Sequence, residues 1–281
     1  IAIAKHLLAV GVKNIIMCDR FGIVCEGMSE LNPAQAEMSK ITNREKMQGT
    51  LADALCGADV FIGVSAPGVV TQDMIRSMAK DPIVLAMANP VPEIMPEIAK
   101  KAGALVVGTG RSDYPNQINN VIGFPYIFRG ALDVAATAIN EEMKLAAVKA
   151  IADLAKQPVP EIVNKVYKVR NLSFGRDYFI PKPVDPRLLV EVSTAVAKAA
   201  IESGVARKTI TDWEKYKEHL LEFMGRESKL TQQLHDIART QTQRVVFAEG
   251  AHPSMMKAAV QAKEEGICQP ILLGNDEIIS K

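Results

Sequence analysis

Polar residues that could do chemistry follow the predicted strands of this sequence. Asp19 comes directly after a strand predicted over residues 14–18, where a carboxylate typically accepts hydrogen bonds from the adenosine ribose of a dinucleotide. Arg20, beside it, could instead meet a 2′-phosphate. A turn aspartate and a solvated arginine are an equally good interpretation, because no glycine fingerprint precedes them in the sequence. The pair leaves the choice between NAD and NADP open.

Small residues follow the next predicted strand, in the run FIGVSAPGVVT. Ser65 and Ala66 would let a dinucleotide backbone approach the chain closely, and Gly68 permits a tight turn. The alternative is an ordinary turn. The third strand ends in AMANPVPE, where Asn89 offers both an amide donor and an acceptor. Such a side chain suits a substrate hydroxyl or carboxylate, although an Asn-Pro turn is an equally good interpretation.

A polar connector, GTGRSDYPNQINNV, follows the fourth predicted strand. Its side chains could reach a ligand crevice, and the candidates are Arg111, Asp113, Asn116, Asn119 and Asn120. Asn119 and Asn120 also stand directly before an apolar run, which is typical of a helix N-cap. For this pair the cap is the favoured local interpretation.

Segments of helical spacing alternate with short β-branched runs, which predicts an α/β fold with a doubly wound parallel, Rossmann-like sheet. Strands are predicted over residues 14–18, 59–63, 83–88 and 104–108, and helices over 1–10, 33–40, 50–55, 71–79 and 94–101. Ligands of such sheets bind beyond the carboxyl ends of the strands. The sequence therefore predicts that the candidate residues gather at one edge of the sheet.

The pattern changes after the sheet, where helices are predicted over 141–157, 161–169, 186–203 and 211–224. The expected domains are residues 1–225, a linker helix at 226–243, and a second α/β unit at 244–281. In that unit we expect strands at 244–249 and 270–273, with helices at 253–265 and from 276 onward. Its 38 residues are too few to bury both faces of a parallel strand pair, so an incomplete domain is expected.

The composition excludes several classes of protein. The chain has 281 residues, 48% of them hydrophobic, and a formal net charge of +1, so disorder and a basic nucleic-acid surface are not expected. Its four cysteines form no CxxC pair and its histidines no HExxH motif, so neither a disulfide framework nor a zinc site is predicted. Without a membrane span or signal peptide in the pattern, a cytoplasmic protein is expected.

Several runs together resemble the nucleotide-binding domain of bacterial malic enzymes. They cover roughly residues 1–225 and include FIGVSAPGVVT, MANPVPE, GTGRSDYPNQINNV, FPYIFRGALDVAATAINEEMKLAAVKAIADLA and FGRDYFIPKPVDPRLLVEVSTAVAKAAIESGVA. The last part, RVVFAEGAHPSMMKAAVQAKEEGICQPILLGN, resembles the start of a phosphotransacetylase domain. This order is characteristic of the long, hybrid bacterial malic enzymes.

The resemblance implies oxidative decarboxylation of L-malate to pyruvate and CO2, with reduction of NAD or NADP and help from Mg2+ or Mn2+. It implies that Asn89 and Asn120 bind the substrate. It further implies a cofactor site made of Asp19, Arg20, Val64, Ser65, Ala66, Asn89 and Asn119.

The family's general base, general acid and metal ligands are expected ahead of Ile1, so no catalytic or metal-binding residue is predicted within the chain. On this view the chain is an internal fragment, inactive alone, of a homo-oligomeric enzyme that acetyl-CoA could regulate. The alternatives are a non-catalytic dinucleotide-binding module and another 2-hydroxy-acid dehydrogenase.

Overall fold

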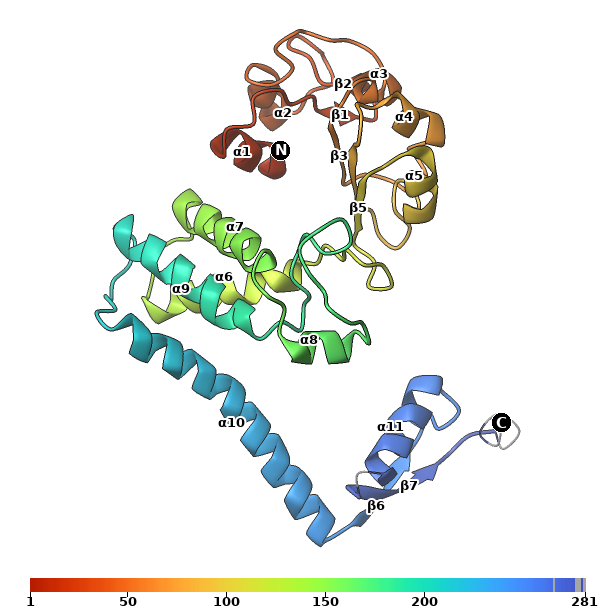
Figure 1. The fold of residues 1–281 in the computed structure, drawn as a ribbon, viewed down its shortest axis with the longest axis vertical. Coiled ribbons are helices and arrows are strands. Elements are labelled where there is room, and N and C mark those ends of the chain that lie inside the picture. Colours follow the sequence, from red (N-terminus) through yellow and green to blue (C-terminus); the bar gives the residue numbers. More distant parts are fainter. Residues whose placement is uncertain (265, 276–278, 280–281) are drawn as a thin grey trace. The chain divides into compact units, whose positions relative to one another are not determined.

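The structure is a computed structural model that describes residues 1–264, 266–275 and 279. It divides into two compact units, Ile1–Thr211 and Asp212–Lys281. The first unit holds a parallel sheet and two groups of helices, as Figure 1 shows. The second unit begins at a long helix and continues into a short strand-helix-strand segment.

Three parallel strands form the sheet of the first unit. They are β3 (Val60–Gly63), β4 (Ile83–Ala86) and β5 (Val106–Thr109), hydrogen-bonded in that order. In register, Val60 lies opposite Ile83, which in turn lies opposite Val106, so the three strands end at one edge. The α/β class and three of the expected strands are therefore confirmed.

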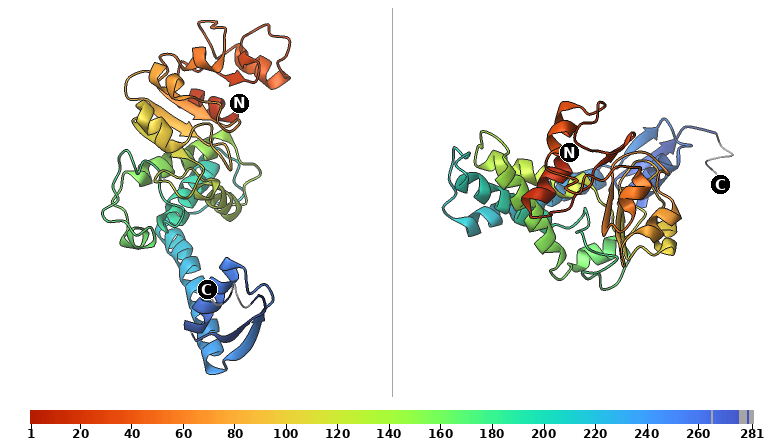
Figure 2. Two further views of the ribbon diagram at one scale, coloured as in Figure 1. Left: turned by 90° about the vertical axis from the view of Figure 1, so that its right-hand side faces the viewer. Right: turned by 90° about the horizontal axis from the view of Figure 1, so that it is seen from above.

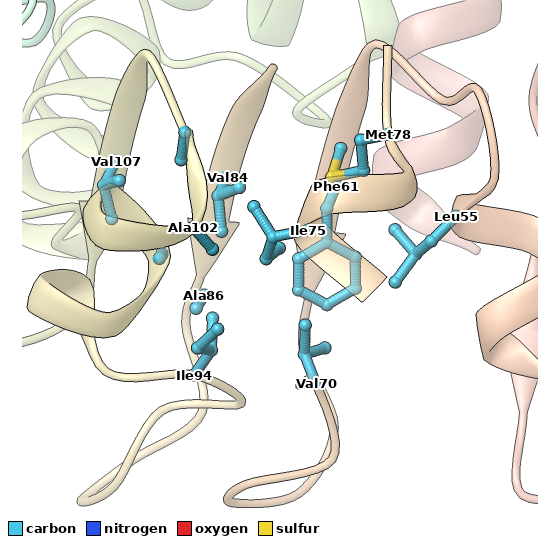
Figure 3. Close-up of a cluster of buried hydrophobic side chains, with 12 residues drawn as sticks. Leu55, Phe61, Val70, Ile75, Met78, Val84, Ala86, Ile94, Ala102 and Val107 are labelled. Atoms are coloured by element: carbon cyan, nitrogen blue, oxygen red, sulfur yellow. The ribbon is translucent and has the colours of Figure 1, made fainter. Parts of the chain in front are cut away.

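Helices pack on one face of this sheet because alternate strand residues are apolar on that side. Phe61, Val84 and Val107 project from the three strands into a buried cluster, shown in Figure 3. The opposing side chains include Ile75 of α4 and Ala99 of α5. The helices on this side are α3 (Leu51–Leu55), α4 (Gln72–Ser77) and α5 (Pro96–Ala102), seen from two further directions in Figure 2.

The first predicted strand, over residues 14–18, is not part of this sheet, and that prediction is wrong. In the described residues, β1 (Cys18–Asp19) pairs antiparallel with β2 (Gly22–Ile23) instead. The carbonyl of Met17 accepts a hydrogen bond from the amide of Val24 at 2.8 Å. The carbonyl of Ile15 accepts from the amide of Asn43, also at 2.8 Å. These backbone groups thus pair with later parts of the chain, which an apolar run in the sequence cannot reveal.

The other expected helices of the amino-terminal part form, with shifted ends. They are α1 (Ala2–Ala9) and α2 (Pro33–Ser39). Asn32 caps α2, because its side chain accepts from the amide of Gln35 at 2.9 Å and the Gln35 side chain accepts from the amide of Asn32 at 3.0 Å. Reciprocal capping of this kind satisfies donors that the helix itself leaves free.

A group of helices follows the sheet. It comprises the short 3-10 helix η1 (Asn120–Ile122), α6 (Phe124–Asp133), α7 (Glu141–Ala155), α8 (Glu161–Val166) and α9 (Arg187–Glu202). Helix α6, absent from the sequence expectations, packs against α9, as α7 also does (Figure 1). Gly130 permits this approach, since a β-carbon there would lie 2.5 Å from the carbonyl oxygen of Ser193.

The second unit begins with α10 (Trp213–Thr240), one helix where two had been expected over 211–224 and 226–243. Then follow β6 (Gln243–Phe247), α11 (Pro253–Glu264) and β7 (Cys268–Leu272), with β6 and β7 parallel. The helix expected from residue 276 falls on 276–278 and 280–281, outside the described residues. The domain limits at 225 and 243 stay a prediction.

Candidate functional site

The loop after β3 is exposed at the carboxyl edge of the sheet. Residues 64–69 are all exposed, and Val64 is 66% exposed although it is apolar. Gly68 has a φ of +68° and no heavy atom within 4 Å of a β-carbon built on it. Small, exposed residues at this edge leave room for an extended ligand to lie against the backbone.

A buried carboxylate, that of Glu93, fixes this loop to the next one. Its Oε1 accepts hydrogen bonds from the amide of Ser65 at 2.7 Å and from the Ser65 hydroxyl at 3.2 Å. Its Oε2 accepts from the amide of Ala88 at 3.0 Å. Glu93 is 0% exposed, so these bonds replace the water that its charge would otherwise attract.

Asn89 follows Ala88 directly and its side chain is exposed. It lies against the backbone after β5, because a β-carbon on Gly110 would come within 2.9 Å of both terminal atoms of the Asn89 amide. No hydrogen bond joins this amide to another of the described residues. Its donor and acceptor are therefore free for a ligand.

The connector after β5 turns back onto the end of that strand. The amide of Thr109 donates to the carbonyl of Asn116 at 3.1 Å, and the amide of Ile118 donates to the carbonyl of Thr109 at 2.7 Å. This pairing carries Asn119 and Asn120 beyond the carboxyl end of β5. Candidate residues therefore stand in the three connections that follow β3, β4 and β5.

The two neighbouring asparagines take different places. The Oδ1 of Asn119 accepts from the amide of Val121 at 3.0 Å, so Asn119 caps η1. Asn120 is exposed, and its side chain makes no hydrogen bond to the described residues. Asn119 is therefore a helix cap, as the sequence predicted for this pair, and the Asn120 side chain is available to a ligand.

Asp19 and Arg20 lie outside the parallel sheet and contact their own neighbours. The Asp19 carboxylate accepts from the amide of Phe21 at 2.8 Å and from the side-chain amide of Gln35 at 2.9 Å. The Arg20 guanidinium lies 4.6 Å from the centre of the Phe21 ring and is exposed. A carboxylate has about four acceptor positions, so Asp19 retains capacity for a ribose.

Other polar residues of the connector hold structure. Asp113 forms two hydrogen bonds with Arg111, at 2.9 and 2.7 Å, which lower the pKa of the Asp113 carboxyl and raise that of the guanidinium. Asn116 is buried and donates to the carbonyls of Val107 and Arg176, at 3.1 and 2.7 Å. These contacts shape the connector and leave no free group for a ligand on Asn116.

A buried lysine, Lys182, donates a hydrogen bond to the connector that follows β5. Lys182 is 5% exposed and donates to the carbonyl of Pro115, with its Nζ 4.7 Å from the centre of the Tyr167 ring. Burial lowers the pKa of Lys182, because removal from water disfavours the ammonium form. The contact fixes the turn that precedes Asn119.

Within the described part of the chain, no three side chains of His, Cys, Asp or Glu gather closely enough to hold a metal ion. The resemblance implies that the ligands of Mg2+ or Mn2+ lie ahead of Ile1, so this finding does not test the expected metal. Across the same residues, no helix is both long and apolar enough to cross a membrane.

A parallel sheet with exposed polar loops at its carboxyl edge defines a Rossmann-type α/β domain. Residues 8–176, more than half of the chain, match the family described as "Malic enzyme, NAD binding domain". The chain belongs to the malic enzyme family. Residues 229–281 match a second family, "Phosphate acetyl/butaryl transferase", so both resemblances read from the sequence are confirmed.

Known relatives agree with this assignment. The chain is 46% identical over 282 residues to an NADP-dependent malic enzyme of Escherichia coli, and covers 37% of that protein's length. It is 43% identical over 283 residues to an NAD-dependent malic enzyme of Rhizobium meliloti, of which it covers 36%. A crystal structure of malic enzyme from Pyrococcus horikoshii matches 79% of this chain and 49% of its own, with 39% identity and a TM-score of 0.67.

Sequence reasoning missed Glu93. An isolated acidic residue is normally solvated, and the contacts that bury this one come from residues 28 and 5 positions earlier in the chain. The available signal was its surroundings, VPEIMP, where no other charge or small polar residue is present. A single charge among apolar residues and prolines indicates either a turn or a buried carboxylate.

Proposed function

We propose that this chain provides the dinucleotide- and substrate-binding domain of an enzyme that oxidatively decarboxylates L-malate to pyruvate and CO2, with a nicotinamide dinucleotide as hydride acceptor. The observation that carries the proposal is the free amide of Asn89 at the carboxyl edge, beside the exposed loop of residues 64–66. A dinucleotide on that loop would bring a small hydroxy acid within reach of Asn89. The names of the relatives support the same reaction.

Each residue has a part in this proposal. Val64, Ser65 and Ala66 support the dinucleotide, and the Asn89 amide binds a carboxylate or hydroxyl of malate through its donor and acceptor. Asn120, exposed beyond β5, binds the substrate as well. Asn119 borders the cofactor and orients this turn through its cap. The nicotinamide ring of the bound dinucleotide would accept the hydride that leaves malate.

The choice of cofactor depends on Asp19 and Arg20. Free acceptor positions on Asp19 favour the ribose hydroxyls of NAD, whereas the exposed guanidinium of Arg20 attracts the 2′-phosphate of NADP. NADP is the proposed cofactor, with NAD as the alternative. Mg2+ or Mn2+, a homo-oligomer and acetyl-CoA control remain expectations that the resemblance carries, and a cytoplasmic location remains an expectation from the sequence pattern.

Calorimetric titration of the chain with NADP and then NAD tests the cofactor site. We expect saturable binding of NADP, weakened by Arg20→Ala and unchanged by Arg44→Ala, an exposed arginine elsewhere in the same unit. Tighter binding of NAD would reverse the cofactor assignment. If neither NADP nor NAD binds, the result would contradict a dinucleotide site formed by this chain.

Substitution of the asparagines tests the substrate site, with turnover measured on the full-length protein. Asn89→Ala and Asn120→Ala should each lower kcat/KM for malate by about 10- to 100-fold, because each removes a hydrogen bond of roughly 1.5–3 kcal/mol to a charged or reacting group. The affinity for the dinucleotide should change little.

Asn14→Ala is the matched control, since Asn14 is exposed and belongs to none of the connections that follow β3, β4 and β5. Normal malate turnover by both site variants would overturn the assignment. Dinucleotide binding without turnover of malate by the unmodified protein would favour the non-catalytic binding module.

A further inference from the structure

We infer that Glu93 is a positioning residue that holds the dinucleotide loop and the substrate asparagine at one fixed spacing. This inference rests on the proposed function and adds to it a residue that touches neither ligand. Its basis is a buried carboxylate whose two oxygens bind two different loops of the same edge.

The hydrogen bonds are divided between the loops. Oε1 accepts from the amide and hydroxyl of Ser65, in the middle of the loop at residues 64–66. Oε2 accepts from the amide of Ala88, whose next neighbour is Asn89. One rigid planar group therefore sets the distance between the place of the cofactor and the place of the substrate.

The chemistry of the group suits this task. A carboxylate accepts at both oxygens, and a backbone N–H meets each oxygen of Glu93. The Glu93 side chain forms no ion pair with any described residue, so hydrogen bonds alone offset the loss of its hydration. A neutral amide in this place would direct an N–H2 group at one of the two backbone donors.

Gly63 provides the room for this carboxylate. A β-carbon at that position would lie 2.5 Å from the carboxyl carbon of Glu93 and 2.7 Å from its Oε1. Gly63 is the last residue of β3 and has no positive φ, so close approach, and not backbone conformation, requires a glycine there. The position of the Glu93 carboxylate therefore depends on a glycine at the end of β3.

The first test is amide hydrogen exchange of this chain, read residue by residue by NMR. In Glu93→Gln we expect the amide of either Ser65 or Ala88 to exchange at least about tenfold faster, because one of them loses its acceptor. The side-chain amide signal of Asn89 should shift as well. Protection elsewhere in β3, β4 and β5 should stay as it was.

Glu97→Gln is the matched control, since Glu97 lies four residues on, is exposed, and its carboxylate accepts a hydrogen bond from the Tyr114 hydroxyl at 2.8 Å. It should leave the signals of Ser65, Ala88 and Asn89 unchanged. Faster exchange throughout the sheet in Glu93→Gln would indicate a merely structural role and overturn the inference. Unchanged exchange at both Ser65 and Ala88 would overturn it too.

The second test is titration of the same variants with NADP. Glu93→Gln should raise the Kd about tenfold or more, and Ser65→Ala, which removes only the hydroxyl donor to Glu93, should raise it less. Ser65→Ala retains the backbone bond and so provides a folded variant if Glu93→Gln does not fold. An unchanged Kd in both variants contradicts the inference.

The two proposals fail separately. If the unmodified chain binds no dinucleotide, the proposed function loses its support, while hydrogen exchange still shows whether Glu93 fixes Ser65 and Ala88. If the chain binds NADP and Glu93→Gln leaves exchange unaltered, the proposed function stands and the role of Glu93 does not.

Discussion

The thiol groups of this protein differ sharply in their surroundings. All four cysteines are free; Cys25 and Cys268 are buried, Cys18 is half-buried and Cys56 is exposed. Burial, followed by the nearby Asp19 carboxylate, raises the pKa of Cys18 to about 11. Since the thiolate is the reactive form, Cys18 is protected by its raised pKa as well as by its burial.

We therefore expect one rapidly reacting thiol, that of Cys56. At pH 8 a group with a pKa of about 11 is thiolate to only about 0.1%, so Cys18 should react far more slowly. Alkylation with iodoacetamide followed by peptide mass spectrometry measures this. Cys56→Ser should abolish the fast phase, and a second fast thiol at Cys18 would contradict the expectation.

At the scale of single residues, the sequence identified which side chains were candidates and could not divide their tasks. Asn119 and Asn120 are chemically identical, yet one caps η1 and the other is free. The difference depends on where η1 begins, which the hydrogen bonds of the returning connector decide. Residue type alone carries no information about that choice.

At the scale of elements, α6 and α9 pack closely at Gly130. The carbonyl oxygen of Ser193 would lie 2.5 Å from a β-carbon at Gly130, and the side chain of Val196 at 2.8 Å. Backbone atoms cannot move aside as a flexible side chain can, so the two helices would have to separate. The packing of α6 on α9 therefore requires a residue without a β-carbon at position 130.

Gly130→Ala should consequently lower the free energy of unfolding by about 1–3 kcal/mol, the usual cost of overpacking a core. Urea denaturation followed by circular dichroism measures the change. Gly123→Ala is the matched control, because a β-carbon there meets nothing closer than 3.7 Å. Equal stability of the two variants would show that α6 and α9 are less closely packed than the structure has them.

At the scale of the whole molecule, the two compact units differ in how much they bury. Among the described residues from 243 onward, the buried ones are Gly250, Ala259 and Cys268. The first four residues of β6 are all exposed. The sheet of the first unit, in contrast, includes a cluster of twelve buried apolar residues. Local opening of β6 and β7 therefore exposes little apolar surface.

We expect the amides of β6 and β7 to exchange at least about tenfold faster than those of β3, β4 and β5, because opening free energy follows buried apolar area. Hydrogen exchange with mass spectrometry on the intact chain measures both sheets in one sample. Equal protection in the two sheets would contradict this difference in stability.

The sequence by itself determined the α/β class, three parallel strands and helices such as α2. These features depend on periodicity and on side chains within about four residues of one another, so a local pattern predicts them. It also selected Asn89 and Asn120, because residues after strands must lie at the carboxyl edge. Their roles as ligands remain predictions.

Only the tertiary structure decided the pairing of residues 14–18 and the role of Glu93. Met17 pairs with a segment that follows a turn, and Glu93 accepts from donors in two separate loops. Both outcomes depend on which backbone groups lack partners once the sheet has formed, and folding brings those groups together from distant positions. Satisfaction of buried polar groups is a property of the folded chain, so no pattern of neighbouring residues expresses it.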